Sequence, residues 1–219
     1  MHFEILVEGH TELIALSTLM RKIIGEYGNP HTWRIHKHRG IGSIPENPEN
    51  KPDKRNQTLL HNLPSKLRGY GRAMTTEEAV VVLVDLDRND CNAFKNKLTN
   101  LLTYCNTPPN TLFRIAIEEL EAWYFGDPAA LKAAYPDLKN SVLSSYLQDS
   151  QCGTWEKLAD AIYTGGLKSL LSHGKRSIQI LEQKCIWAKD IAPQMNVEIN
   201  SSPSFCCFRD GIRRMAQYT

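Results

Sequence analysis

The stretch Val80-Val81-Val82-Leu83-Val84-Asp85-Leu86-Asp87-Arg88-Asn89-Asp90 decides the fold of this chain. Its first five residues are apolar and mostly β-branched, which is typical of a strand buried on both faces of a parallel sheet. The run ends abruptly in carboxylates, so we expect Asp85 and Asp87 at the carboxyl edge of the sheet. Open α/β sheets place their binding sites at that edge. In an extended backbone the two carboxylates share one side, because side chains alternate with period two.

A second segment of the same kind opens the protein, where Phe3-Glu4-Ile5-Leu6-Val7 runs into Glu8-Gly9-His10-Thr11-Glu12. Glu8 and Glu12 are both candidate metal ligands. Glu8 follows a buried strand, whereas Glu12 is also explained as an acid that favours the first turn of a helix. His10 is more simply an exposed turn residue than a catalytic base. Clustered carboxylates repel one another unless a cation or a shared proton compensates them, and Mg²⁺ takes oxygen ligands. The two strand ends together predict a site for Mg²⁺ or Mn²⁺.

A third acidic segment, Ile117-Glu118-Glu119-Leu120-Glu121-Ala122-Trp123, follows a third strand candidate at residues 112–117. If a helix begins at Glu118, then Glu118 and Glu121 share a face and Glu119 points elsewhere. The alternative is an exposed acidic first turn. We take Glu118 and Glu121 as candidate ligands of a second ion.

The order of elements predicts a largely parallel, Rossmann-like α/β sheet with right-handed crossovers, flanked by helices. Apolar spacing predicts helices at residues 11–25 and 92–104, and residues 28–64, rich in Pro and Asn, are expected to form a long loop followed by a short helix. We expect an α/β core over residues 1–128 and a helical part over 129–219, with helices at 155–171 and 178–192, packing on the core as a cap over the sheet edge.

Composition sets few limits on function. The 219 residues contain 26 Lys plus Arg and 24 Asp plus Glu, so the net charge is only +2. Any basic surface must be local, and residues 33–72 hold the richest basic stretch, which attracts phosphate backbones or forms a solvated loop. The six cysteines form no CxxC pair and are expected to be free thiols. No signal peptide or membrane-spanning run is visible, so we expect a cytoplasmic protein with no membrane partner.

The acidic motifs, together with Gly126-Asp127-Pro128 and Asn200-Ser201-Ser202-Pro203-Ser204-Phe205, make the chain resemble the bacterial DUF4276 family. That family is considered Toprim-like, similar to the nuclease domains of overcoming-lysogenization-defect (OLD) proteins. In the Toprim pattern a Glu follows the first strand and a DxD follows a later one, and Glu8, Asp85 and Asp87 fill those positions. The resemblance implies a Toprim-like fold, metal binding and nuclease activity.

Two further expectations come from the same resemblance. OLD-type nucleases use a basic residue, for which Lys184 and Lys189 are the best counterparts and Lys175 is the third. Related proteins often work with an ATPase of the ABC or OLD type in antiphage systems. Ser202 and Ser204 contact phosphate or water, or they form a helix cap or turn.

The leading hypothesis is a Mg²⁺- or Mn²⁺-dependent phosphodiester hydrolase acting on nucleic acid, with DNA favoured over RNA. Glu8, Asp85 and Asp87 hold the metal in this hypothesis, Glu118 and Glu121 hold a second ion, and a lysine stabilises the departing oxygen. The alternative is a non-catalytic metal-binding subunit that docks an ATPase. A phosphatase of the haloacid dehalogenase kind is the weakest candidate, because its nucleophilic Asp normally sits on the first strand. The oligomeric state stays open.

Overall fold

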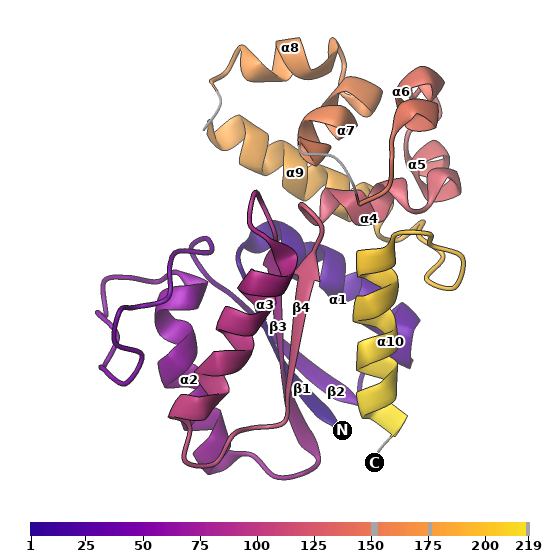
Figure 1. Ribbon diagram of the computed structural model, residues 1–219. Helices are drawn as coiled ribbons and strands as arrows, with labels where there is room; N and C mark the ends of the chain where they lie inside the picture. The colour runs from indigo at the N-terminus through magenta and orange to yellow at the C-terminus, as the bar shows by residue number, and fades with distance from the viewer. Residues whose placement is uncertain (150–152, 175–176, 218–219) are drawn as a thin grey trace.

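Four parallel strands form one sheet in the order β2-β1-β3-β4, in a computed structural model that describes residues 1–149, 153–174 and 177–217 (Figure 1). The strands are β1 (His2–Val7), β2 (Thr32–Lys37), β3 (Glu78–Asp85) and β4 (Thr111–Ala116). The central pair is in register with Ile5 opposite Val81. The predicted α/β class and the parallel sheet are confirmed.

Helices cover both faces of the sheet. Alternate residues of β3 enter opposite cores: Val80, Val82 and Val84 pack in the core that contains α2 (Leu59–Ala73) and α3 (Cys91–Asn100). Val81 and Leu83 pack in the core that contains α1 (His10–Ile24). This two-sided burial explains why the β3 sequence is apolar at successive positions.

The remaining helices follow in sequence from the end of α3. They are the 3₁₀ helix η1 (Leu101–Tyr104), then α4 (Glu121–Phe125), α5 (Pro128–Ala134), α6 (Asn140–Ser145), α7 (Thr154–Ile162), α8 (Gly166–Leu171), α9 (Ile178–Ile191) and α10 (Pro203–Gln217). Figure 1 shows α4 to α9 gathered beyond the carboxyl ends of the strands. The predicted helix over residues 155–171 is interrupted at Gly165, whose backbone has a φ of 81°.

The expected loop over residues 28–64 is wrong, because β2 lies inside it and α2 begins at Leu59. β2 is an edge strand with only two apolar side chains, Trp33 and Ile35, in alternation with polar ones. A pattern this short is easily hidden by its Pro- and Asn-rich surroundings. The helix that follows is also longer than expected, and it contains Pro64.

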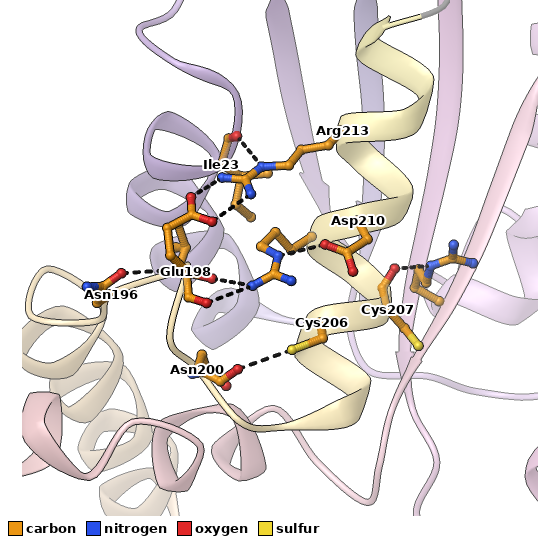
Figure 2. Close-up of polar contacts among 11 residues, drawn as sticks. Ile23, Asn196, Glu198, Asn200, Cys206, Cys207, Asp210 and Arg213 are labelled. Carbon is orange, nitrogen blue, oxygen red and sulfur yellow. Dashed lines mark hydrogen bonds and ion pairs between the residues drawn. The ribbon is translucent and has the colours of Figure 1, made fainter.

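The helical part over residues 129–219 does not stay together as a cap. Its last helix, α10, returns to the sheet and packs against β4 and α1. Polar contacts hold it there: Arg213 donates to the Ile23 carbonyl at 3.0 Å and pairs with Glu198 (Figure 2). Arg114 of β4 donates to the Cys207 carbonyl at 2.8 Å. α10 is therefore part of the α/β core, and among the described helices of this part α5 to α9 lie over the edge together with α4.

Five of the six cysteines are described, and all five are free thiols, as the sequence predicts. Cys152 lies outside the described residues. In the described ranges, no helix has the length and apolar character needed to cross a membrane.

Two glycines of α2 offer a matched test of packing between this helix and the η1–β4 loop. A Cβ at Gly71 would lie 1.8 Å from the Thr107 carbonyl oxygen, whereas a Cβ at Gly69 meets nothing within 4 Å. We expect Gly71→Ala to lower the free energy of unfolding by about 1–3 kcal/mol, because backbone must shift. Gly69→Ala should raise it by roughly 0.5–1 kcal/mol, because alanine favours helix. Urea denaturation of both variants measures the difference, and equal effects would refute this packing.

Candidate active site

Glu8 and Asp85 lie together at the carboxyl edge of the sheet, where β1 and β3 are neighbours. The Glu8 carboxylate accepts a hydrogen bond of 2.8 Å from the backbone N–H of Asp85. In the sheet, β1 has β2 on one side and β3 on the other. The chain runs from β1 through α1 to β2, and later strands are added on the β3 side, so the direction of winding changes between β1 and β3. Open α/β sheets bind their ligands at such a switch point. The sequence placed both acids correctly in space, and their role stays a prediction.

Asp87 lies at the rim of this site and is exposed. β3 ends at Asp85, and Asp87 has a left-handed backbone with a φ of 49°, a conformation that Asp tolerates better than most residues. The premise that Asp85 and Asp87 alternate along one extended strand is therefore wrong. The Asp87 N–H donates to the Glu118 carbonyl at 3.0 Å, which joins the end of β3 to the turn after β4.

Glu12 belongs to the site because the first turn of α1 brings its carboxylate back over Gly9. A Cβ on Gly9 would lie 3.2 Å from Glu12 Oε2, so a glycine here leaves room for the carboxylate. Oε2 is buried and has no hydrogen-bond partner in the described residues. Helix-dipole stabilisation of an exposed acid does not account for this buried, unpartnered oxygen.

The three glutamates in the turn after β4 make different contacts from those that the sequence predicts. α4 begins at Glu121, not at Glu118, so the assumed helical spacing does not apply. Glu118 accepts hydrogen bonds from the N–H groups of Gly153 at 2.7 Å and Thr154 at 3.0 Å. It therefore caps the start of α7. Glu119, which was expected to point elsewhere, faces the acidic cluster instead.

Lys184 of α9 reaches into the middle of these acids. Its ammonium lies 3.1 Å from Glu121 Oε1 and 3.9 Å from Glu119 Oε1. Burial alone would lower the pKa of Lys184, but the negative charges of Glu121, Glu119, Asp85 and Glu12 outweigh it and raise the pKa above its ordinary value. Lys184 is thus a permanent cation at neutral pH. Of the two leading lysine candidates, the structure brings this one to the acids.

The other predicted basic and polar candidates lie elsewhere. Lys189 is exposed in the last turn of α9, because five residues along a helix turn a side chain to another face. Lys175 lies outside the described residues. Ser202 accepts from the Phe205 N–H at 3.3 Å, and the Ser204 N–H donates to Asp149 at 2.7 Å, so this segment forms the capped start of α10. His10 is exposed at the first residue of α1.

The acidic cluster consists of Glu8, Glu12, Asp85, Glu119 and Glu121 around Lys184, and it is electrostatically unbalanced. Burial raises the pKa of Glu8 to about 8; the Asp85 N–H opposes this shift and the charges of Glu12 and Asp87 add to it. Burial, then the charge of Glu121, raises the pKa of Glu119 to about 8. The pKa values of Asp85 and Glu12 are raised for the same first reason. Glu8 and Glu119 therefore retain protons near neutral pH, because burial and neighbouring carboxylates outweigh the single ammonium of Lys184.

Two residues at the site were missed in the sequence. Tyr124 is fully buried, and its hydroxyl has no hydrogen-bond partner in the part of the chain that is described. Burial and the neighbouring charge of Glu121 raise the pKa of Tyr124 well above its ordinary value, so it stays an O–H donor. Glu156 of α7 also has a buried, unpartnered Oε2. Nothing in the local sequence distinguishes either residue from a core tyrosine or a surface helical acid.

The donor set fits a hard divalent cation. Carboxylate oxygens are the ligands such ions take, and Glu12 Oε2 and Glu121 Oε2 are buried and accept no hydrogen bond from described residues. Across those residues, no three His, Cys, Asp or Glu side chains converge closely enough to enclose an ion as they stand. Lys184 lies among the carboxylates in this arrangement. The metal site stays a prediction, and its residues have the chemistry it requires.

A family model described as "Domain of unknown function (DUF4276)" matches residues 7–212. The chain belongs to the DUF4276 family. No curated protein and no solved structure matches it. The range that defines the DUF4276 domain begins at the last residue of β1 and includes every member of the acidic cluster. The matched range therefore contains three of the four strands and the helices that complete the site.

Stability of the metal-free DUF4276 protein should fall with rising pH. The folded pKa values of Glu8 and Glu119 are about 8, against 4.5 ordinarily, so the folded state binds more protons between these values. This stabilisation is complete below the ordinary value and is lost as pH rises through about 8. Thermal melting with EDTA from about pH 6 to about pH 9 should show a loss on the order of a few kcal/mol. Glu8→Gln should show a smaller loss, and an unchanged profile in that variant would contradict the assignment.

Lys184 and Lys189 provide a matched pair on the same helix. Removing a buried ion-pair partner leaves uncompensated charge, so Lys184→Ala should lower the free energy of unfolding by on the order of 3 kcal/mol at about pH 8 without metal. The effect should shrink at about pH 6, where the carboxyl groups take up protons. Lys189→Ala should stay within about 0.5 kcal/mol of the wild type. Chemical denaturation measures both, and equal effects would show that Lys184 is not integrated in the cluster.

Proposed function

We propose that this DUF4276 protein is a Mg²⁺- or Mn²⁺-dependent phosphodiester hydrolase of Toprim type. The observation that carries the proposal is the acidic cluster at the switch point, where burial and then the charges of neighbouring carboxylates raise the pKa values of Glu8 and Asp85. Perturbed carboxyl groups at a sheet edge are typical of catalytic centres. The resemblance of the Glu8, Asp85 and Asp87 pattern to Toprim nucleases supports the same chemistry.

The residues have distinct roles in this proposal. Glu8, Asp85 and Asp87 would hold the metal, with Glu12 and Glu121 available for a second ion, while Glu118 is occupied at the start of α7. A bound divalent ion would activate water and neutralise charge on the phosphate. Lys184 provides a fixed positive charge for the departing oxygen, and the Tyr124 hydroxyl is a donor in the same buried region.

The substrate and partner follow from the resemblance and from charge. Nucleic acid is the proposed substrate, with DNA favoured over RNA, and an ATPase of the ABC or OLD type is the proposed partner in an antiphage system. The described residues include no GxxxxGK[ST] phosphate loop, so nucleotide hydrolysis in such a system would belong to the partner.

A second candidate is a non-catalytic metal-binding subunit that docks the ATPase. Its support is the exposed apolar side chains on α9, where Ile178 is 64% and Leu181 is 61% exposed. In that case Lys184 and the acids would serve to hold α9 over the sheet. Metal titration combined with an activity assay separates the two candidates, because a docking subunit needs no hydrolysis.

Asp85→Asn tests the hydrolase directly, with Asp90→Asn as a control in the loop that follows β3. Both variants lose one negative charge, and Asn can replace Asp90 as the cap of α3, where Asp90 accepts from the Ala93 N–H at 2.7 Å. With Mg²⁺ or Mn²⁺ and labelled DNA, Asp85→Asn should lower the cleavage rate by at least about 100-fold, because removing even an outer contact of a metal ligand costs about 10–100-fold. Asp90→Asn should cleave at the wild-type rate.

The stability of the Asp85 variant completes this test. Removing one of several repelling carboxyl groups relieves repulsion, so the metal-free melting temperature of Asp85→Asn should hold or rise. Retained cleavage by this folded variant would overturn the hydrolase proposal. Unfolding of the variant would instead identify Asp85 as a structural residue.

A further inference from the structure

A pocket of about 830 Å³ opens beside β2, between the start of α1 and the loop that precedes α2. Its cationic side chains are Arg34, Lys37, Arg39, Lys54 and Lys66, and three histidines also line it. No Asp or Glu is among its described lining residues. The net charge of the chain is only +2, so a pocket whose titratable lining side chains are all basic concentrates positive charge at one place on the surface.

The outer wall of this pocket is an ordered loop. Its ends are joined where the Arg39 N–H donates to the Gln57 carbonyl and the Leu59 N–H donates to the Gly40 carbonyl, each at 3.0 Å. Its middle is held by Arg68 of α2, which donates to the Glu49 carbonyl at 3.2 Å. Lys54 of the loop and Lys37 of β2 therefore belong to two walls whose backbones are fixed.

The pocket and the acidic cluster share the segment that carries Glu8. The Gly40 N–H donates to the Glu8 carbonyl at 2.9 Å, and the His38 N–H donates to the Val7 carbonyl at 3.1 Å. His10, which lines the pocket, is two residues from Glu8 and begins the helix that carries Glu12. A polyanion bound in the pocket would therefore lie next to the segment that carries Glu8 and Glu12.

We infer that this pocket binds a single-stranded segment of nucleic acid through its phosphates and leads that strand to the acidic cluster. Its volume lies in the range of small-molecule sites, roughly 300–1,000 Å³, which suits a few nucleotides but not the width of a duplex. Basic grooves of this kind track single strands, on which histidine rings also stack. The inference rests on the proposed function and specifies its substrate as single-stranded.

Binding without catalysis tests the inference. Fluorescence anisotropy in EDTA would compare a labelled oligothymidylate of roughly 12 nucleotides with the duplex of the same length. The pocket variant is Lys37→Glu with Lys54→Glu, one change on each wall. The control is Lys132→Glu with Lys157→Glu, which makes the same change in net charge at exposed positions of α5 and α7.

The single strand should bind more tightly than the duplex. The pocket variant should bind the strand at least about tenfold more weakly, and its slope of log affinity against log salt should be shallower by about 0.7 for each phosphate that a lysine no longer neutralises. The control should bind as the wild type does. Unchanged binding in the pocket variant, an equal weakening in the control, or a duplex bound as tightly as the strand would each overturn the inference. Because EDTA prevents metal-dependent cleavage, failure of the hydrolase proposal alone would leave this binding result unchanged.

Discussion

The ion pair between Lys184 and Glu121 is the interaction on which the rest of the site depends. Two parallel strands deliver Glu8 and Asp85 to the same edge, and the turn after β4 adds Glu119 and Glu121, so negative charge accumulates in a region with little water. Without a cation this edge would repel itself. Lys184 supplies one from α9, a helix far along the chain, and thereby ties the helices beyond the sheet edge to the α/β core.

The path of the chain places α9, and with it Lys184, next to the acidic sheet edge. After β4 it leaves the sheet, builds α4 to α9 over the edge, and returns as α10 beside β4 and α1. The Asn200 side chain donates to the Trp123 carbonyl at 2.8 Å, and the Ser201 N–H donates to the Gly126 carbonyl at 2.8 Å, which joins the returning segment to α4. The motif at residues 200–204 thus positions the glutamate-bearing helix, and its Ser202 hydroxyl caps α10.

The sequence predicts what local chemistry determines and misses what depends on distant packing. Buried strands that end in carboxylates placed Glu8 and Asp85 at one edge, because parallel strands bring equivalent ends together. The turn after β4 was misjudged because the first residue of α4 depends on Glu118 capping α7, a contact across 35 residues. Lys184 and Lys189 look alike in sequence, and only the packing of α9 against α1 distinguishes the inner one. β2 escaped prediction because an edge strand needs few apolar residues.

The electrostatic asymmetry around Glu8 links the fold to the proposed chemistry. On one side of this segment lie carboxyl groups that retain protons, and on the other lies a pocket whose described titratable side chains are all basic. Under the proposed function, the basic side would attract a phosphate backbone, and a divalent cation on the acidic side would compensate the carboxylates that otherwise repel it. In the proposed function, productive binding of a strand would therefore depend on the metal, because the metal-loaded edge would accept a phosphate more readily than the metal-free one. β1 lies between the strands that border the two regions, so Glu8, which follows β1, is the residue at which they meet.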